Sequence, residues 1–327
     1  MSKAPAPLLS VVVPLYNEAA GLPGFHESLL SVVRAATKGS YEIIYCDDGS
    51  DDGTADIIKR LHADDPEVKL VRLSRNFGKE SVLTAGIAAA SGEAVLTIDG
   101  DGQHPVGRIP DFIKAWRQGA QVVVGVRVNY AGDGFLNSLG SWLFYRLFNL
   151  FTGHKLLPGS TDFRLIDKSV AKAFLSLKEG DRITRGLIDW LGFKREIISF
   201  QAGRRQAGSA AYSRGQLIQL AANSFVSFSP KPLYLFGYLG MAITFFSLLL
   251  GTTVIIEQLV LGDPWQWDFT GTAMLGILTL FLVGIILLSQ GILSLYISHI
   301  HSQAKGRPLY VIDYSQSVGL EQPAREN

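Results

Sequence analysis

The chain has 327 residues, with 30 lysines and arginines against 29 aspartates and glutamates, so its formal net charge is only +1. This balance excludes a strong global field that would recruit nucleic acid, and we expect no nucleic-acid partner. A single cysteine, Cys46, excludes an internal disulfide framework and suits a reducing compartment. The mean hydropathy of +0.22 is high for a soluble protein, and the apolar excess lies toward the carboxyl end.

Short β-branched runs alternate with amphipathic stretches over about the first 130 residues. The runs that predict buried strands are 10–14, 41–47, 68–73, 94–99 and 121–126. The stretches with helical periodicity are 21–36, 54–63, 79–90 and 108–118. This alternation predicts parallel βαβ units and therefore an α/β fold with a doubly wound, mostly parallel sheet.

Polar side chains follow three of the predicted strands. The clusters are Tyr16-Asn17-Glu18, Asp47-Asp48 and Asp99-Gly100-Asp101. Ligands of doubly wound sheets bind beyond the carboxyl ends of the strands, which is where these clusters are expected. Asp and Asn also cap helices, which explains any one cluster, but three together predict an active site.

Two long apolar stretches lie near the carboxyl end, at about 233–258 and 270–297. Each exceeds the roughly 20 residues needed to cross a bilayer. The link between them contains Trp265 and Trp267, which favour the membrane interface. We therefore expect a two-helix transmembrane hairpin within 232–300, preceded by a catalytic domain at 1–210 and a juxtamembrane amphipathic segment at 211–231, and followed by a tail at 301–327.

Basic residues flank this hairpin on one side only. Lys231 precedes the first stretch, Lys305 and Arg307 follow the second, and the link between the stretches has no lysine or arginine. The positive-inside rule then predicts an integral protein of the plasma (inner) membrane, with its catalytic domain and both termini in the cytosol. Residues 135–151 and 216–228 are also apolar, and we expect helices there that lie in the membrane interface; packing against the sheet is the alternative.

The segment Asp99-Gly100-Asp101-Gly102-Gln103 is the strongest candidate for a metal site. Two carboxylates separated by one residue, on a turn that leaves a strand, can bind one hard divalent cation, and Gln103 can add a carbonyl oxygen. Mg²⁺ or Mn²⁺ bound there would neutralise a departing diphosphate. An Asp-x-Asp pair alone is a weak signal, and its place after a buried strand strengthens it.

Four loops in register carry a family resemblance. They are Pro14-Leu15-Tyr16-Asn17-Glu18, Asp47-Asp48-Gly49-Ser50, Arg75-Asn76-Phe77-Gly78-Lys79 and Asp99-x-Asp101-x-Gln103-His104-Pro105. In this order and spacing they resemble the family 2 glycosyltransferases, which implies a GT-A-like fold. The segments Thr161-Asp162-Phe163-Arg164-Leu165 and Ser229-Pro230-Lys231-Pro232, with the paired apolar stretches, resemble more narrowly the polyprenyl-phosphate type, such as dolichyl-phosphate mannosyltransferase and the bacterial undecaprenyl-phosphate enzymes.

The resemblance implies roles for individual residues. The donor is expected to contact Pro14, Tyr16, Asn17, Glu18, Asp47, Asp48, Lys79 and Asp99. The metal ligands are expected to be Asp99, Asp101 and Gln103. The expected catalytic residues are Asp101, Asp162, Arg127 and Arg164, with Asp162 in a loop before Phe163-Arg164. The expected acceptor-phosphate residues are Arg205, Arg182 and Arg185. Simpler alternatives are formation of the turn for Asp47 and Asp48, a solvated helix start for Lys79, a pair with Asp162 for Arg164, and a surface face for Arg182 and Arg185.

The implied reaction is an inverting transfer of a sugar from a UDP- or GDP-sugar to undecaprenyl or dolichyl phosphate at the cytosolic membrane face. The alternatives are transfer to another membrane lipid, such as diacylglycerol, and a non-catalytic membrane scaffold. A homo-oligomer is compatible with the sequence. One position departs from the family, which usually carries Arg-x-x-Gly-Glu-Ser-Lys-Tyr where this chain has Ala211 in place of the lysine.

Overall fold

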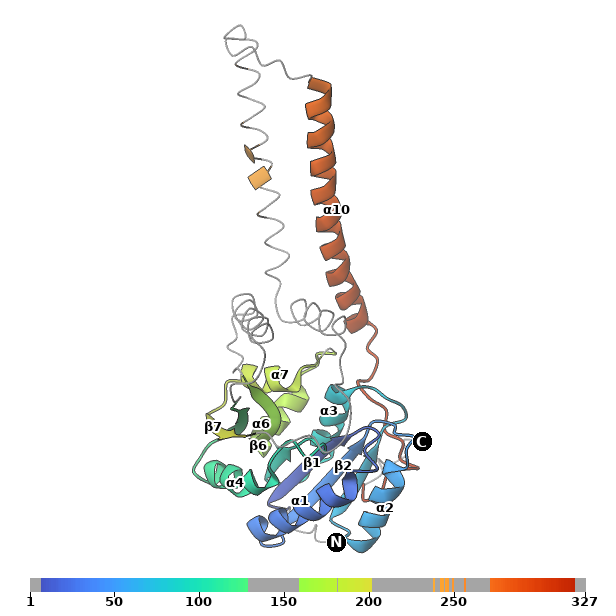
Figure 1. The fold of residues 1–327 in the computed structure, drawn as a ribbon, viewed down its shortest axis with the longest axis vertical. Coiled ribbons are helices and arrows are strands. Elements are labelled where there is room, and N and C mark those ends of the chain that lie inside the picture. The colour runs from blue at the N-terminus through green and yellow to red at the C-terminus, as the bar shows by residue number, and fades with distance from the viewer. Residues whose placement is uncertain are drawn as a thin grey trace. The chain divides into compact units, whose positions relative to one another are not determined.

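The computed structural model of the chain describes residues 7–128, 159–180, 182–201 and 271–320, together with isolated residues between 238 and 256. The described residues form a sheet domain and one long helix, which belong to two different compact units. Figure 1 labels their helices and strands in chain order.

The sheet has seven strands in the order β3-β2-β1-β4-β6-β5-β7. Their bounds are Leu9–Leu15 (β1), Tyr41–Asp47 (β2), Val68–Arg72 (β3), Ala94–Thr97 (β4), Val122–Arg127 (β5), Ser160–Asp167 (β6) and Arg195–Phe200 (β7). The neighbours pair in parallel except at β6, which runs antiparallel to both β4 and β5. All five predicted strands are confirmed, and β6 and β7 are additions. Asp162, which the sequence analysis places in a loop, lies inside β6.

The helices pack as two groups. Their bounds are Leu22–Thr37 (α1), Thr54–Asp64 (α2), Lys79–Ala89 (α3), Ile109–Arg117 (α4), Lys168–Ser176 (α6) and Thr184–Trp190 (α7), with a 3-10 turn at Val106–Arg108 (η1). Helix α1 contacts α2 and α4, whereas α3 contacts α6 and α7 (Figure 1). The four predicted helices are confirmed. Their order with the strands explains the parallel half of the sheet, since each helix carries the chain back to the same edge.

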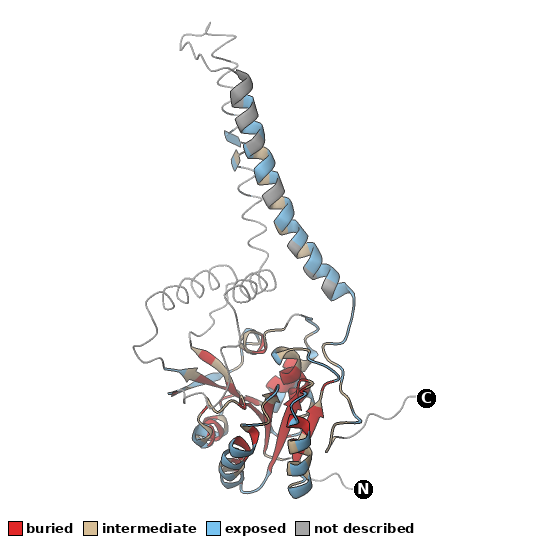
Figure 2. Ribbon diagram, turned by 45° about the vertical axis from the view of Figure 1, so that its right-hand side comes forward, coloured by how far each residue is buried: buried red, intermediate tan, exposed pale blue. Residues whose placement is uncertain are grey.

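The core lies on the central strands, which are buried (Figure 2). Strands β1 and β2 are apolar almost without interruption, because helices cover both faces of the sheet there. On the β6 side the core is aromatic: the rings of Phe112 and Phe163 lie 4.3 Å apart, centroid to centroid. This packing fixes β6 beside β4, and with it the position of Asp162.

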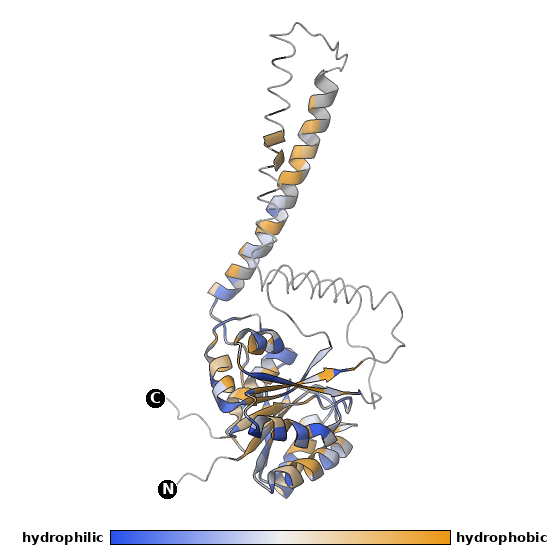
Figure 3. Cartoon of the chain, turned by 90° about the vertical axis from the view of Figure 1, so that its left-hand side faces the viewer, coloured by the Kyte–Doolittle hydropathy of each residue, from blue (hydrophilic) through white to orange (hydrophobic). Residues whose placement is uncertain are grey.

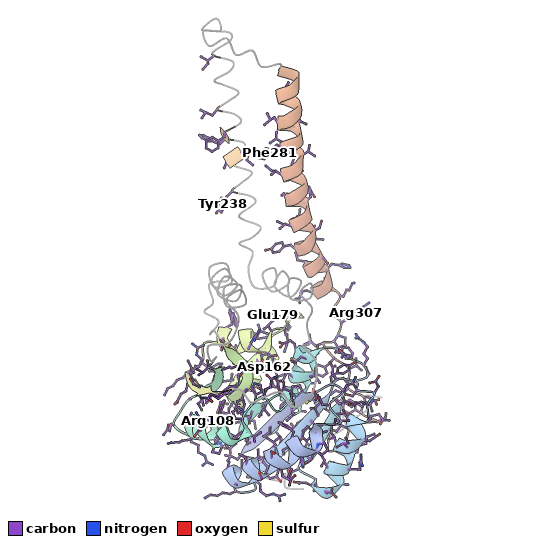
Figure 4. The ribbon with its side chains drawn as sticks, viewed as in Figure 1. Arg108, Asp162, Glu179, Tyr238, Phe281 and Arg307 are labelled. Atoms are coloured by element: carbon purple, nitrogen blue, oxygen red, sulfur yellow. The ribbon has the colours of Figure 1, made fainter. Side chains whose placement is uncertain are left out.

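The segment after the long helix returns to the sheet. From Arg307 (Figure 4) to Leu320, its described residues belong to the same compact unit as the strands. Val318 forms an antiparallel bridge with Leu70 of β3, and Ile312 forms another with Leu73. The predicted tail at 301–327 begins within the end of α10, and these bridges attach its described part after Arg307 to the β3 edge of the sheet.

The long helix, α10, spans Gly271–Ala304 and confirms a helix at the second predicted apolar stretch. At 1.5 Å per residue its 34 residues extend about 51 Å. Its window Phe281–Ser298 has a mean hydropathy of 2.0 and no buried residue, so its length and composition allow it to cross a bilayer (Figure 3). In the described part of the chain this is the single such helix, and one helix is weak evidence by itself. The predicted segments 135–151 and 211–231, and nearly all of 233–258, lie outside the described residues.

Candidate active site

Two neighbouring loops at the carboxyl edge of the sheet are joined by hydrogen bonds that backbone amides donate. The Asp48 amide donates to the Leu15 carbonyl at 2.9 Å, and the Asn17 amide donates to Ser50 Oγ at 2.9 Å. The Glu18 amide donates to Thr54 Oγ1 at 3.1 Å. Tyr16 and Asn17 are exposed on this edge, and Pro14 and Glu18 are partly exposed. The predicted donor residues after β1 therefore lie together, next to the loop after β2.

The Asp48 carboxylate is occupied by hydrogen bonds from the protein's own backbone. One of its carboxylate oxygens accepts from the Phe77 amide at 2.7 Å and the other from the Gly78 amide at 2.8 Å. Burial raises the pKa of Asp48 although both amides favour the charged form. The predicted donor contact through Asp48 is therefore not supported by this geometry, because its carboxylate holds the segment that begins α3.

Asp47 lies deeper in the same loop and is fully buried. Its Oδ1 accepts from the Ser50 amide at 3.1 Å, and its Oδ2 lies 3.4 Å from Nε of Arg72 on β3. Gly49 has φ +74°, and a Cβ there would lie 2.7 Å from the Arg75 carbonyl carbon, so the loop requires glycine. The structure thus brings the loops after β1, β2 and β3 together, with Arg72 as a member that the sequence analysis did not select.

Lys79 joins two carboxylates from different strands. Its Nζ lies 2.7 Å from Asp99 Oδ1, just after β4, and 2.7 Å from Asp162 Oδ2 in β6. Figure 4 labels Asp162. Burial disfavours the ammonium, but the charges of Asp162 and Asp99 outweigh it and raise the pKa of Lys79. Burial likewise disfavours the Asp162 carboxylate, and the cations Lys79, Arg185 and Arg164 more than compensate, so the pKa of Asp162 is lowered. Lys79 is therefore a member of the site rather than a solvated helix start.

Asp101 and Gln103 form a tight turn beside Asp99. The Gln103 amide donates to Asp101 Oδ1 at 3.0 Å, and all three side chains are partly exposed. His104 follows and is buried, with its ring 5.4 Å from Phe163 and 5.6 Å from Phe200, centroid to centroid. Burial lowers the pKa of His104, so its imidazole is neutral at pH 7. His104 stabilises the turn, because the Asp99 amide donates a hydrogen bond to its Nδ1 at 3.4 Å.

The acidic turn fits a divalent cation. Within the described ranges, no group of three or more His, Cys, Asp or Glu side chains is placed to hold a metal by itself. Mg²⁺ and Mn²⁺ are commonly bound by one or two carboxylates, with water and substrate phosphates as the remaining ligands, and Asp99 with Asp101 supplies such a pair. The Lys79 ammonium lies against Asp99, so a divalent cation would compete with it for that carboxylate.

Arg164 has a different partner from the one expected. Its side chain is 2 % exposed, and its Nη1 lies 2.8 Å from Asp189 Oδ1 of α7. Its Nε also donates to the Thr161 carbonyl at 3.1 Å. A buried guanidinium that is already paired with a carboxylate offers little surface to a ligand, so this geometry does not support a catalytic contact for Arg164, and that role stays a prediction. Its ion-pair partner is Asp189, whereas it acts on Asp162 only through its charge.

The other predicted arginines differ in exposure. Arg182 donates to the carbonyls of Leu177 and Glu179 and lies 5.2 Å from the Phe174 ring centroid, so it holds the end of α6 rather than forming a surface face. Arg185 is partly exposed and acts on Asp162 through its charge.

Arg127 is exposed at the end of β5. Its amide donates to the Gly159 carbonyl at 2.9 Å. Arg205 lies outside the described residues.

Glu80 is a site residue that the sequence analysis did not select. Its Oε2 accepts from the Thr184 amide at 2.7 Å, which ties the start of α3 to the start of α7. Burial and the charge of Asp162 raise its pKa. The position of Glu80 beside Lys79 at the start of α3 was the available signal.

Comparison with known proteins agrees with this arrangement. The family model described as glycosyl transferase family 2 matches residues 10–175. The chain belongs to this family. Its mostly parallel sheet with the antiparallel β6 is GT-A-like, as the sequence analysis predicts.

Similar relatives match along nearly the whole chain. An uncharacterized glycosyltransferase of Bacillus subtilis is 35% identical over 314 residues, covering 95% of this chain and 94% of the relative. A prophage-derived bactoprenol glucosyl transferase of Shigella flexneri is 34% identical over 307 residues, covering 94% and 98%. Among solved structures, the glucosyl-3-phosphoglycerate synthase of Mycobacterium tuberculosis, in complex with Mn²⁺ and UDP, has 20% identity and a TM-score of 0.46, covering 68% of this chain and 78% of that one.

Proposed function

We propose that this glycosyltransferase transfers a sugar from a UDP- or GDP-sugar to a polyprenyl phosphate. The observation that carries the proposal is the cluster of Lys79, Asp99 and Asp162 beside Asp101, at the sheet edge where the exposed donor loop also lies. The polyprenyl phosphate acceptor is supported by the relatives named bactoprenol glucosyl transferases, which match this chain over 93% or more of its length. Their names make glucose the first donor sugar to test.

We also propose that the protein is anchored by a two-helix hairpin in the plasma (inner) membrane. Helix α10 supplies one apolar helix, and the predicted span at 233–258 supplies the other. The basic residues Lys231, Lys305 and Arg307 support a cytosolic catalytic domain with both termini on the same side. Such an anchor would keep the site beside the headgroup of a lipid that is too apolar to leave the bilayer.

The chemistry we propose is a single displacement. A phosphate monoester has a second pKa of about 6, so at pH 7 its oxygens are already nucleophilic and no general base is needed. One phosphate oxygen attacks the anomeric carbon as the bond between that carbon and the donor diphosphate breaks. The nucleoside diphosphate leaves with the bonding electrons, and the configuration at the anomeric carbon is inverted.

The acidic turn would serve the leaving group. A divalent cation held by Asp99 and Asp101, with Gln103, would neutralise the charge that develops on the diphosphate. The loop after β1, with Pro14, Tyr16, Asn17 and Glu18, would bind the nucleotide, and the buried Asp47 would form the floor of that pocket.

Lys79 and Asp162 would act on the reacting groups themselves. Lys79 holds Asp162 ionised, so its carboxylate can stabilise positive charge that develops on the sugar ring. The exposed Arg127 and the partly exposed Arg185 would screen the two anionic substrates from each other, together with Arg205. Because Asp162 lies on a strand rather than a loop, its position is fixed before substrate binds.

The deciding experiment incubates the full chain in detergent with undecaprenyl phosphate, Mg²⁺ or Mn²⁺ and a panel of labelled UDP- and GDP-sugars. The proposal expects an extractable glycolipid that mild acid releases, and an Asp101→Asn variant supplies the blank. Label in diacylglycerol instead would establish the other lipid acceptor. Free sugar alone would indicate hydrolysis, and no turnover with any donor would favour a non-catalytic scaffold.

A further inference from the structure

The tail after α10 is hydrogen-bonded along the edge strand β3. The amide and carbonyl of Leu70 exchange hydrogen bonds with those of Val318, at 3.0 and 3.1 Å. The Ser74 amide donates to the Val311 carbonyl at 2.9 Å, and Lys59 Nζ of α2 lies 2.6 Å from Gln316 Oε1. These contacts cover the backbone of an edge strand that would otherwise be open on that side.

The tail forms hydrogen bonds with both the backbone amide and the backbone carbonyl of Arg72 in β3. Its amide donates to Ser317 Oγ at 3.0 Å, and its carbonyl accepts from the Asp313 amide at 2.8 Å. The Ser317 hydroxyl in turn donates to the Asp313 carbonyl at 2.8 Å, so its proton and its acceptor site are both used. The tail therefore fixes the backbone from which the Arg72 side chain extends.

The Arg72 guanidinium reaches the donor side of the site. Its Nη2 donates to the Ser50 carbonyl at 2.9 Å, and its Nε lies 3.4 Å from Asp47 Oδ2. Ser50 then receives the Asn17 amide on its hydroxyl oxygen, which connects this loop to the exposed loop after β1. An unbroken series of contacts thus runs from the tail through Arg72 to both loops of the proposed nucleotide pocket.

We propose that the carboxyl-terminal tail, acting through Arg72, is a positioning element for the nucleotide part of the donor. This inference rests on the proposed nucleotide-sugar donor. It makes Arg72 and Ser317 positioning residues, since neither is proposed to touch the sugar or the acceptor. Because the tail directly follows α10, the segment that leaves the apolar helix also sets the affinity for the soluble substrate.

The test compares two variants that each remove one hydrogen bond between the tail and the sheet domain. Ser317→Ala removes the bond to the Arg72 amide, and Lys59→Met removes a side-chain bond between α2 and Gln316 in which Arg72 takes no part. Binding of UDP and of GDP to the full chain in detergent with Mn²⁺ is measured by calorimetry. If the whole of one hydrogen bond of about 1 kcal/mol is lost from nucleotide binding, the Kd of Ser317→Ala rises by about 5-fold, which is the upper limit of the expected effect. We expect Lys59→Met to leave the Kd unchanged, Arg72→Met to raise it more than Ser317→Ala, and Ser317→Thr to restore it.

Thermal unfolding separates positioning from simple stabilisation. If Ser317→Ala and Lys59→Met lower Tm alike while only Ser317→Ala raises the Kd, the tail positions the pocket. If Ser317→Ala lowers Tm and leaves the Kd at the wild-type value, the tail only protects the sheet edge and the inference is overturned. Wild-type protein that binds neither nucleotide would remove the donor proposal itself, and this inference with it.

Discussion

Replacing Lys79 with methionine removes the ammonium that lies 2.7 Å from an oxygen of Asp99 and 2.7 Å from an oxygen of Asp162. Two opposite charges at 2.7 Å attract by about 6 kcal/mol at an effective dielectric constant of about 20, before the cost of desolvation. The Lys79 side chain is 41 % exposed, so solvent screening reduces the net value to about 1–2 kcal/mol.

This interaction competes with a divalent cation for Asp99. In the absence of the nucleotide sugar, we therefore expect Lys79→Met to bind Mn²⁺ about 5- to 30-fold more tightly than wild type. This ratio of affinities corresponds to the net interaction of about 1–2 kcal/mol. We expect the opposite effect on sugar transfer, because the variant loses the charge that holds Asp162: kcat/KM should fall by about 100-fold.

The assay is a titration of Mn²⁺ against the full chain, with free Mn²⁺ measured by electron paramagnetic resonance. Lys79→Arg keeps the positive charge and is the matched control, expected to bind Mn²⁺ as wild type does. The reasoning is refuted if Lys79→Met binds Mn²⁺ no more tightly than wild type under conditions where Asp101→Asn loses the ion.

Three further substitutions test separate parts of the structure. Asp101→Asn keeps an acceptor for the Gln103 amide, so we expect its Tm to be unchanged. Its kcat should fall by about 1000-fold, because the metal loses a carboxylate ligand. A fall in both kcat and Tm would contradict a role in metal binding alone. Arg164→Met leaves the largely buried Asp189 carboxylate without this partner and should lower the unfolding free energy by about 3 kcal/mol. Adding Asp189→Asn should recover part of that loss. A single variant as stable as wild type would show that the pair does not stabilise the fold.

The third substitution, Glu42→Gln, concerns pH. Burial opposes the Glu42 carboxylate, but Lys69, Ser10 and Ser91 outweigh burial and lower its pKa. Because the pKa of Glu42 is lower in the folded than in the unfolded protein, its carboxylate stabilises the fold. This stabilisation is complete above the unfolded-state pKa of about 4.3 and is lost as the pH falls through the folded-state pKa. Thermal melts should therefore show wild type losing more Tm than Glu42→Gln between about pH 5 and pH 3, and parallel losses would count against this.

The parallel half of the sheet could be predicted because its signals are local. Strands β1 and β2 each contain a short β-branched run, Val11–Val13 and Ile43-Ile44, and each is followed by a stretch of helical period. Strand β6 was missed although its sequence alternates polar and apolar residues, since Asp162 and Arg164 alternate with Phe163 and Leu165. That alternation indicates a strand, but its resemblance to a family motif suggested a loop.

The pairing of side chains could not be predicted from spacing. Asp48, Arg164 and Arg182 have the residue types of a phosphate or donor site, yet each is bound by groups of its own protein. Which charges face a ligand depends on which partners the tertiary fold brings near them. Asp189 and Thr184, which decide this for Arg164 and Glu80, lie more than 20 residues away along the chain.

Strand β6 divides the catalytic edge between two parts of the chain. The loops proposed for the donor follow β1, β2 and β4, whereas Asp162 arrives on a strand running in the opposite direction, from the connection that leaves β5. The two ends of that connection meet where the Arg127 amide bonds the Gly159 carbonyl. The chain leaves β5 and enters β6 at this one point, so the loops proposed for the donor and the carboxylate of Asp162 reach the edge from separate parts of the sheet.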